Sequence, residues 1–321
     1  MNYKDLRIIY MGTPEFAVAP LDLLIKNDCN VVAVVTAPDK PSGRGLQLSE
    51  SAVKKYAKEK DLKILQPEKL KSPEFINELK SLNADLQIVV AFRMLPEVVW
   101  NMPPLGTFNL HASLLPQYRG AAPINWAIIN GETKTGVTTF FIQHEIDTGN
   151  IIFQEEVFIE EEDNVGTLYT KLMNKGSELV LKTVKAIAEG NAPSIPQTNI
   201  TKENLKQAPK IFKETCHINW NNSAESIHNL IRGLSPYPAA FFNLKDDNKG
   251  EISIKVYQSK PEIEAHSIQA GTIVTDNKKV LKVACSNGFV TITELQAAGK
   301  KRMKTEEFLR GFKISPNCRA F

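Results

Sequence analysis

Residues 7–36 read RIIYMGTPEFAVAPLDLLIKNDCNVVAVVT, and this pattern indicates a strand, a helix and a second strand. Arg7–Met11 is apolar and β-branched, and Gly12–Pro14 ends the run. Apolar residues then recur at helical spacing over Phe16–Ile25, before the buried-type strand Val31–Thr36. A strand, a helix and a strand in such close succession favour a parallel β-α-β unit.

The same alternation continues along the first half of the chain. Ile64–Leu65 and Asp85–Ala91 read as further strands, each after a helical stretch. This order predicts an α/β fold in which a parallel sheet is covered by helices on both faces. The later elements expected in this part are a strand leading into an irregular segment over Gly106–Leu115, a short helix over Ala122–Asn130, strands over Thr135–Ile142 and Ile151–Ile159, and a long amphipathic helix over Val165–Glu189.

The C-terminal third has a different order of predicted secondary-structure elements. Asn191–Pro209 contains three prolines and no periodicity, so we predict a linker there. After a short helix over Ala224–Leu234, five short strands follow at close spacing, as in a small β-barrel or sandwich. These strands are expected at Ala239–Leu244, Ile252–Tyr257, Gly271–Thr275, Val280–Ala284 and Phe289–Leu295. The predicted domains are therefore 1–190 and 210–321, joined by the linker 191–209.

The composition excludes several classes of protein. Of 321 residues, 42% are hydrophobic and 23% are charged, which is ordinary for a globular chain and unlike a disordered one. No apolar run approaches the length of a membrane span, and the N-terminus is too charged for a secretory signal, so we expect a cytoplasmic protein with no membrane partner. The four cysteines form no CxxC pair, and no HExxH motif is present, so we expect no metal.

Charge is unevenly distributed along the chain. Residues 207–321 contain 17 Lys+Arg against 11 Asp+Glu, a net charge of +6, whereas residues 1–206 have a net charge of −3. A basic C-terminal third hints at a polyanionic partner. Charge alone is weak evidence for such a partner, because many charge imbalances reflect only solvation.

The first turn after a strand argues against a dinucleotide cofactor. It reads MGTPEFA, which has one glycine in place of GxGxxG and sets Glu15 where a pyrophosphate would approach. The second strand ends at Val35-Thr36-Ala37, without the acidic residue that binds a ribose. A nicotinamide cofactor is therefore not expected.

Residues 108–132, FNLHASLLPQYRGAAPINWAIINGE, contain the most informative chemistry. Asn109 and His111 are two apart in an extended segment, so both project the same way at the carboxyl edge of the sheet, where such folds bind ligands. An amide beside an imidazole can donate hydrogen bonds to an oxyanion. Asp147, in a predicted turn between two strands, could reach His111 and orient its ring or accept a proton; an ordinary turn-capping role stays open.

These residues resemble a known family. Asn109-x-His111, the run Ser113–Gly120 (SLLPQYRG) and Asp147-Thr148-Gly149 are similar to the active-site signature of folate-dependent formyltransferases. The opening MGTPEFA and the closing ELQAAGKKRMKTEEFLRGF extend the similarity, to the members that act on a charged tRNA. The resemblance implies a Rossmann-like N-terminal domain followed by an OB-fold-like β-barrel.

The resemblance also implies the reaction and its participants. The formyl group of 10-formyltetrahydrofolate, the co-substrate, would move to the α-amino group of methionine on initiator tRNA. By position, the catalytic residues would be Asn109, His111 and Asp147. The folate site would be lined by Ser113, Leu114, Leu115 and Pro116. We expect a monomer.

Two basic elements would contact the tRNA. The Gly- and Pro-rich loop 37–48 carries Lys40 and Arg44, and the family has a Gly-Arg-Gly insertion here that reads the acceptor end. The second element, Lys300–Lys304, places four cations in five residues: Lys300, Lys301, Arg302 and Lys304. The aromatic residues nearby are expected in the core and not as platforms for bases: Trp220, Tyr237 and Phe241–Phe242.

Three other readings share the catalytic signature. The enzyme could formylate an amino sugar nucleotide, although such a substrate needs neither loop 37–48 nor a basic C-terminal domain. It could hydrolyse formyl-folate, with water in place of the amine. The third alternative is an RNA-binding protein with an inactive formyltransferase fold, for which an intact set of Asn109, His111 and Asp147 would serve no purpose.

Overall fold

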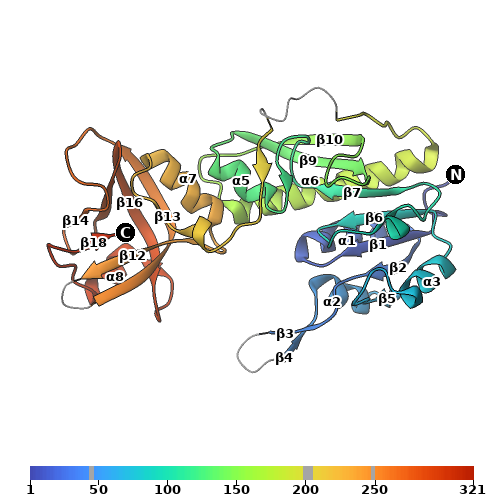
Figure 1. Cartoon of the computed structure of the whole chain (residues 1–321), viewed down its shortest axis with the longest axis horizontal. Coiled ribbons are helices and arrows are strands. Elements are labelled where there is room, and N and C mark those ends of the chain that lie inside the picture. The colour runs from blue at the N-terminus through green and yellow to red at the C-terminus, as the bar shows by residue number, and fades with distance from the viewer. Residues whose placement is uncertain (43–46, 198–204, 247–249) are drawn as a thin grey trace. The chain divides into compact units, whose positions relative to one another are not determined.

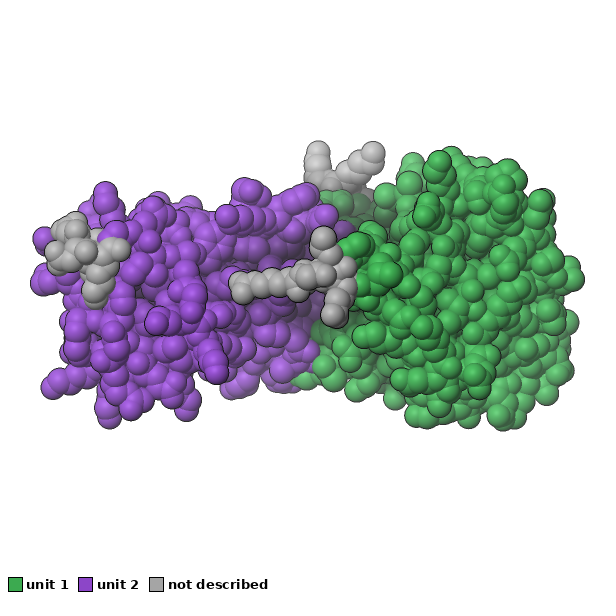
Figure 2. Space-filling view, turned by 90° about the horizontal axis from the view of Figure 1, so that it is seen from below, with its two compact units in different colours: residues 1–120, 135–157, 169–207 green, residues 121–134, 158–168, 208–321 purple. Residues whose placement is uncertain are grey.

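The computed structural model describes residues 1–42, 47–197, 205–246 and 250–321 (Figure 1). The chain divides into two compact units, coloured green and purple in Figure 2. Unit 1 comprises residues 1–120, 135–157 and 169–207, and unit 2 comprises residues 121–134, 158–168 and 208–321. Each unit is organised around a seven-stranded sheet.

The sheet of unit 1 has the strand order β10-β9-β7-β6-β1-β2-β5. Its strands are β1 (Ile8–Gly12), β2 (Val31–Val35), β5 (Ile64–Leu65), β6 (Leu86–Val90), β7 (Thr107–His111), β9 (Lys134–Phe141) and β10 (Ile151–Phe158). Strands β5, β2, β1, β6 and β7 are parallel, and β9 pairs antiparallel to β7. The expected parallel core is therefore confirmed.

Helices cover both faces of this sheet. They are η1 (Glu15–Ala17), α1 (Val18–Lys26), α2 (Ala52–Glu59), α3 (Pro73–Ser81), α4 (Glu97–Trp100) and α6 (Val165–Glu189). Leu79 of α3 and Val99 of α4 belong to one apolar cluster with Met11 and Val89 of the sheet. On the opposite face, Leu110 contacts α6 so closely that a Cβ at Gly176 would lie 2.8 Å from it. The doubly wound, Rossmann-like expectation is confirmed.

The order of the strands fixes where a ligand can bind. The chain runs from β1 outward through β2 to β5, and then returns to β6 on the other side of β1. The carboxyl ends of β1 and β6, at Gly12 and Val90, therefore flank a topological switch point, where open α/β sheets bind ligands. Gly12 permits the close packing there, because a Cβ would lie 2.6 Å from that of Ala17.

Unit 2 is built around a nearly closed antiparallel barrel with the order β14-β15-β16-β13-β12-β18, and β17 pairs with β16. An isolated bridge between Thr272 and Arg319 joins the two ends of this path. The strands are β12 (Ala240–Asp246), β13 (Gly250–Ile263), β14 (Ile273–Thr275), β15 (Leu281–Cys285), β16 (Gly288–Ala297), β17 (Met303–Lys304) and β18 (Arg319–Ala320). The expected OB-fold-like β-barrel is thus confirmed as a small, nearly closed barrel.

Unit 2 also contains two segments that are distant in sequence from the barrel, residues 121–134 and 158–168. Its helices are α5 (Pro123–Ile129), η3 (Glu214–Cys216), α7 (Ala224–Leu234) and α8 (Thr305–Gly311). The Asn125 amide donates to the Gly233 carbonyl at 2.8 Å, and Arg232 donates to the carbonyls of Glu160 and Asp163. These bonds explain why residues 121–134 and 158–168 group with unit 2, which differs from the linear division 1–190, 191–209 and 210–321.

Neither the cysteines nor the helices suggest further chemistry. Cys29, Cys216, Cys285 and Cys318 are all free and buried. Burial raises the pKa of the Cys29 thiol to about 11, which keeps it protonated and unreactive at neutral pH. Within the described ranges, no helix has both the length and the apolar character to cross a membrane.

Candidate active site

Strand β7 supplies two of the three predicted catalytic residues. It lies between β6 and β9, with Asn109 opposite Val89 and Phe140, and His111 opposite Thr138. Because directly paired residues share a face, Asn109 and His111 project from the sheet on the same side as Val89. His111 is the last residue of β7, at the carboxyl edge where the sequence placed it.

The ring of His111 is held by a backbone carbonyl. It is 7% exposed, and its Nε2 lies 2.9 Å from the carbonyl oxygen of Tyr118. A carbonyl oxygen can only accept, so Nε2 carries the hydrogen and donates it. In the neutral ring this leaves Nδ1 as the nitrogen with a free lone pair.

Asp147 meets His111 from the loop between β9 and β10. Its Oδ2 lies 3.8 Å from Nδ1 of His111, too far for a hydrogen bond but close enough for charge attraction when the ring is protonated. The same oxygen accepts a hydrogen bond from the backbone N–H of Gly120 at 3.0 Å. The structure thus brings together the pair that sequence spacing linked, and it points the carboxylate at the free nitrogen of the imidazole.

Two backbone positions constrain the loop that carries Asp147. Asp147 has a φ of 57°, a left-handed conformation that Asp tolerates better than most residues. Two residues later, a Cβ on Gly149 would lie 1.6 Å from the carbonyl oxygen of Phe141. Glycine is therefore required where this loop rejoins the sheet, two residues after Asp147.

Gln197 is a positioning residue that the sequence analysis missed. Its Nε2 lies 2.9 Å from the Asp147 carbonyl oxygen and 2.7 Å from that of Gly149, and its Oε1 accepts from both Nε and Nη2 of Arg119. The segment was expected to be a linker, yet Ile195 pairs with Ile151 at the edge of the sheet. Gln197 is 50 residues from Asp147 and forms no motif with it, so spacing offered no signal.

Asn109 is the predicted catalytic residue whose side-chain amide is still available for hydrogen bonding. Its side chain is half-buried, and among the described residues its amide has no hydrogen-bond partner. An amide that is lodged near His111 and unused by the protein is suited to bind a substrate oxygen. Of the three predicted catalytic residues, the His111 ring is held by a backbone carbonyl and the Asp147 carboxylate faces that ring. The Asn109 amide has no hydrogen-bond partner among the described residues.

The four residues expected at the folate site are largely engaged with the protein itself. Ser113 is fully buried and its hydroxyl donates to the Gln117 carbonyl at 2.7 Å. The Leu115 carbonyl accepts from Nε2 of Gln154 at 2.8 Å. Leu114 and Pro116 keep partly exposed side chains, so a direct role in binding folate stays a prediction and is open mainly to these two.

The predicted tRNA-binding residues lie on exposed segments. Lys40 is exposed in β3 (Lys40–Ser42), which pairs with β4 (Gln47–Ser49), and Arg44 lies outside the described residues. Lys300, Lys301 and Lys304 are exposed in unit 2.

Arg302 differs from its neighbours because its positive charge is partly compensated by Glu294. Its Nη2 lies 2.5 Å from a carboxylate oxygen of Glu294, and its guanidinium lies 4.3 Å from the centre of the Tyr257 ring. The Glu294 carboxylate holds the pKa of Arg302 above its ordinary value. Arg302 is therefore a weaker candidate for phosphate contacts than the three lysines.

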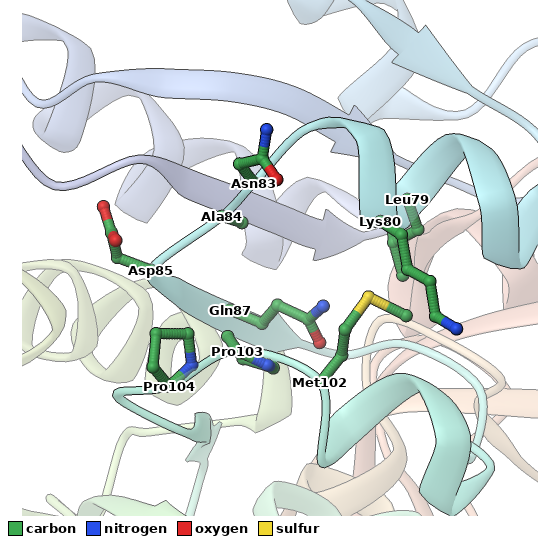
Figure 3. A pocket seen from close by; sticks show the side chains of 9 residues that line it. All are labelled: Leu79, Lys80, Asn83, Ala84, Asp85, Gln87, Met102, Pro103 and Pro104. Atoms are coloured by element: carbon green, nitrogen blue, oxygen red, sulfur yellow. The ribbon is translucent and has the colours of Figure 1, made fainter.

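A cavity of about 550 Å³ lies at the opposite edge of the sheet from His111, at the amino ends of β6 and β7 (Figure 3). Gln87, fully buried, lies in its wall, beside Met102 and Pro103. The Thr107 hydroxyl lies 3.1 Å from Oε1 of Gln87 and 2.6 Å from the Trp100 carbonyl oxygen, and both can accept its hydrogen. This cavity belongs to neither predicted site.

Comparison with known proteins gives the family. Residues 6–184 match the family model described as formyl transferase, and residues 210–313 match the one described as formyl transferase, C-terminal domain. The chain belongs to the formyl transferase family. Within the described part of the chain, no three His, Cys, Asp or Glu side chains gather as metal ligands would.

Two relatives that are similar over nearly their whole length are named methionyl-tRNA formyltransferase. A methionyl-tRNA formyltransferase of Bacteroides thetaiotaomicron is 57% identical over 316 residues, covering 98% of each chain. One of Flavobacterium johnsoniae is also 57% identical, over 318 residues, covering 99% of this chain and 100% of the other.

Solved structures show the shared fold at lower identity. The sugar 3N-formyl transferase WlaRD, crystallised with dTDP and 5-N-formyl-THF, has a TM-score of 0.64 at 22% identity and covers 92% of this formyl transferase and 99% of its own chain. HypX from Aquifex aeolicus, in complex with tetrahydrofolic acid, has a TM-score of 0.61 at 16% identity and covers 95% of this chain and 47% of its own.

Proposed function

We propose that this formyl transferase moves the formyl group of 10-formyltetrahydrofolate to the α-amino group of methionyl-initiator tRNA. The observation that carries the proposal is the arrangement of Asn109, His111 and Asp147 at the carboxyl edge of the sheet. The acceptor follows from relatives named methionyl-tRNA formyltransferase at 57% identity over nearly the whole chain. The donor class agrees with neighbours of the same fold that were solved with folates.

The reaction needs little activation of the amine. An α-amino group has a pKa of about 8, so a useful fraction is a free nucleophile at neutral pH. The larger demand is the negative charge that develops on the formyl oxygen as the amine attacks. Asn109 suits this task, because its amide can donate to that oxygen without giving up another bond.

His111 is suited to move a proton through a single nitrogen. Its Nε2–H is committed to the Tyr118 carbonyl, so Nδ1 is the atom that can take the proton leaving the attacking amine. Once protonated, Nδ1 can donate to the formyl oxygen or pass the proton to the departing folate nitrogen. Both N–H bonds of the imidazolium then have acceptors within the site.

Asp147 can stabilise that protonated ring. Its Oδ2 is 3.8 Å from Nδ1, so the carboxylate lies close to the positive charge that the ring carries once Nδ1 has taken the proton. The Gly120 N–H holds the same oxygen in place, so the carboxylate need not reorganise when the proton arrives. We assign Asp147 to orienting and stabilising His111, with proton relay as the alternative role.

We propose that the two parts of the chain divide the work. Residues 1–190 would carry the chemistry, and residues 210–321 would bind tRNA through Lys300, Lys301, Arg302 and Lys304. Lys40 and Arg44 would contact the acceptor end. The support is the net charge of +6 over residues 207–321 and the exposed placement of the lysines.

The direct test follows labelled formyl groups from 10-formyltetrahydrofolate. With purified protein and methionyl-initiator tRNA, we expect label to reach the tRNA, and little to reach an elongator methionyl-tRNA. Transfer to a dTDP-linked amino sugar, or release as formate without transfer to tRNA, would contradict the proposal. Either result would leave the roles of Asn109 and His111 intact and would reassign the acceptor.

A further inference from the structure

Tyr237 departs from what the sequence led us to expect. Trp220 and Phe242, from the same group of aromatic residues, are 4% and 0% exposed and lie in the core of the barrel, as expected. Tyr237 is 81% exposed, so its predicted place in the core was wrong. Within the described residues, neither its ring nor its hydroxyl makes a hydrogen bond or a ring contact. A large aromatic ring left in water gains much when a partner covers it.

The backbone under Tyr237 is buried and fixed. Ser235 and Ala239 on either side are 1% and 2% exposed, and the Ala239 N–H donates to the Leu234 carbonyl at 2.8 Å. Pro236 and Pro238 flank the tyrosine and fix their own φ angles. Pro236 also lies so near Gly166 that a Cβ there would come within 2.8 Å of its ring. The Tyr237 ring is therefore presented on a rigid support, which lowers the entropy lost when a ligand binds.

A row of polar and basic side chains begins beside this turn. The Nζ of Lys255 donates to the Pro238 carbonyl at 3.3 Å. On the barrel sheet, Lys255 of β13 is paired with Phe241 of β12 on one side and Gln296 of β16 on the other. Gln296 in turn donates to the Lys300 carbonyl at 2.8 Å. We refer to Lys255, Gln296 and Lys300 as the basic row.

The basic row lies on the outer face of the barrel. The residues that alternate with it along the three strands are fully buried: Ala240, Val256 and Leu295. Lys255 and Lys300 are exposed. The row therefore connects Tyr237 with the cationic segment Lys300–Lys304, and the surface combines one free aromatic ring with several cations. Single-strand nucleic-acid sites use this combination, in which bases stack on aromatic rings and phosphates meet lysines.

We propose that Tyr237 is a stacking site for an unpaired base of the tRNA, and that the basic row binds the phosphates next to that base. The inference rests on the proposed function, which supplies an RNA partner. The base must be unpaired, since bases inside a stem stack on each other and offer no free face. The net charge of +6 over residues 207–321 favours a polyanion over an uncharged or basic partner.

The experiment measures equilibrium binding of methionyl-initiator tRNA over a series of salt concentrations. Tyr237→Ala is expected to lower the affinity about 5- to 100-fold at every salt concentration, the usual range for loss of one stacked base. The slope of log affinity against log salt should not change, because the ring carries no charge. Lys255→Ala should instead flatten the slope by about 0.7 to 0.9, the value for one phosphate contact.

Two further variants separate stacking from a structural role. Tyr237→Phe should bind as wild type, because stacking needs the ring and not the hydroxyl. Tyr237→Trp should also bind, and its added fluorescence should be quenched when the tRNA arrives. Ile263→Ala is the matched control, since Ile263 is 69% exposed on the same barrel and lies outside the basic row. It should leave the affinity unchanged.

The outcomes distinguish the inference from the proposed function. If wild type formylates methionyl-tRNA while Tyr237→Ala binds it within twofold of wild type, the inference alone is overturned. Failure of Tyr237→Phe to bind would also overturn it, because the hydroxyl would then be responsible. If wild type neither binds nor formylates the tRNA, the proposed function and the inference fall together.

Discussion

His111 and Asp147 are each held by a backbone group, whereas the side chains of Lys300 and Lys301 are exposed on unit 2. Nε2 of His111 is bound to the Tyr118 carbonyl, and Oδ2 of Asp147 to the Gly120 N–H. Catalysis depends on atoms being within tenths of an ångström of their place, so fixed backbone groups are the suitable support. Long-range attraction to a phosphate backbone tolerates mobile lysines. The two surfaces should therefore respond differently to mutation.

The largest loss of activity is expected from removing the Asn109 side-chain amide, the proposed donor to the formyl oxygen. Asn109→Ala should lower kcat by about 10²- to 10³-fold, the usual cost of one oxyanion donor, and leave folate binding little changed. Steady-state kinetics with methionyl-tRNA measure this. Asn101→Ala, at the exposed end of α4, is the control and should be silent. An Asn109→Ala enzyme with nearly wild-type turnover would remove Asn109 from the catalytic set.

A second variant shifts the Asp147 carboxylate without removing it. Gly149→Ala places a Cβ against the Phe141 carbonyl and forces the Asp147 loop to shift, so kcat should fall by about 10²-fold. The same change at Gly311, where a Cβ would meet nothing within 4 Å, should leave both kcat and Tm nearly unchanged. Full activity in Gly149→Ala, with an unchanged Tm, would show that the position of Asp147 is not critical.

The surface charges should give smaller, salt-dependent effects. The double variant Lys300→Ala/Lys301→Ala should flatten the dependence of log tRNA affinity on log salt by about 1.4 to 1.8, with kcat at saturating tRNA unchanged. Arg302→Ala should change the slope less than either single lysine variant, because Glu294 already compensates its charge. A larger effect for Arg302 than for the lysines would reverse this assignment.

Asp276 tests whether backbone support matters even on an exposed surface. Its carboxylate accepts hydrogen bonds from the N–H groups of Lys278, Lys279 and Val280, each at 2.8 Å, and these lower its pKa to about 2. A lowered pKa means that the folded state favours the carboxylate. The stabilisation is therefore present above about pH 4 and is lost as the pH falls toward 2.

Urea unfolding of wild type and Asp276→Asn measures this smallest effect. The difference in unfolding free energy between the two should be constant from pH 7 to about 4 and should shrink below pH 4. A difference that stays the same down to pH 2.5 would mean that the three N–H groups do not favour the charged form.

Much of the fold was predictable because hydrophobic periodicity decides it. The helices Val165–Glu189 and Ala224–Leu234 begin and end where the pattern predicted, since each repeats apolar residues at helical spacing. That Asn109 and His111 share one side of the sheet was predictable from a two-residue spacing, and the approach of Asp147 to His111 from a turn motif between two strands. Gln197 and Tyr237 were not, because the first acts over 50 residues without a motif and the second follows from how a Pro-flanked turn packs. Such features depend on how segments pack in the folded chain, and no local sequence pattern predicts them.

The interleaving of the two units has a consequence for the order of folding during synthesis. Residues 121–134 emerge from the ribosome inside the sequence of unit 1, yet their partners on α7 are made about a hundred residues later. At roughly 5–20 residues per second, α5 waits on the order of 5–20 s before Gly233 is available. Unit 1 is complete in sequence at residue 207, so its sheet can form while α5 is still unpaired. Slow codons or a ribosomal pause between residues 207 and 233 would therefore lengthen the exposure of α5 to chaperones, and not that of strand β7, whose pairing partners β6 and β9 have already been made.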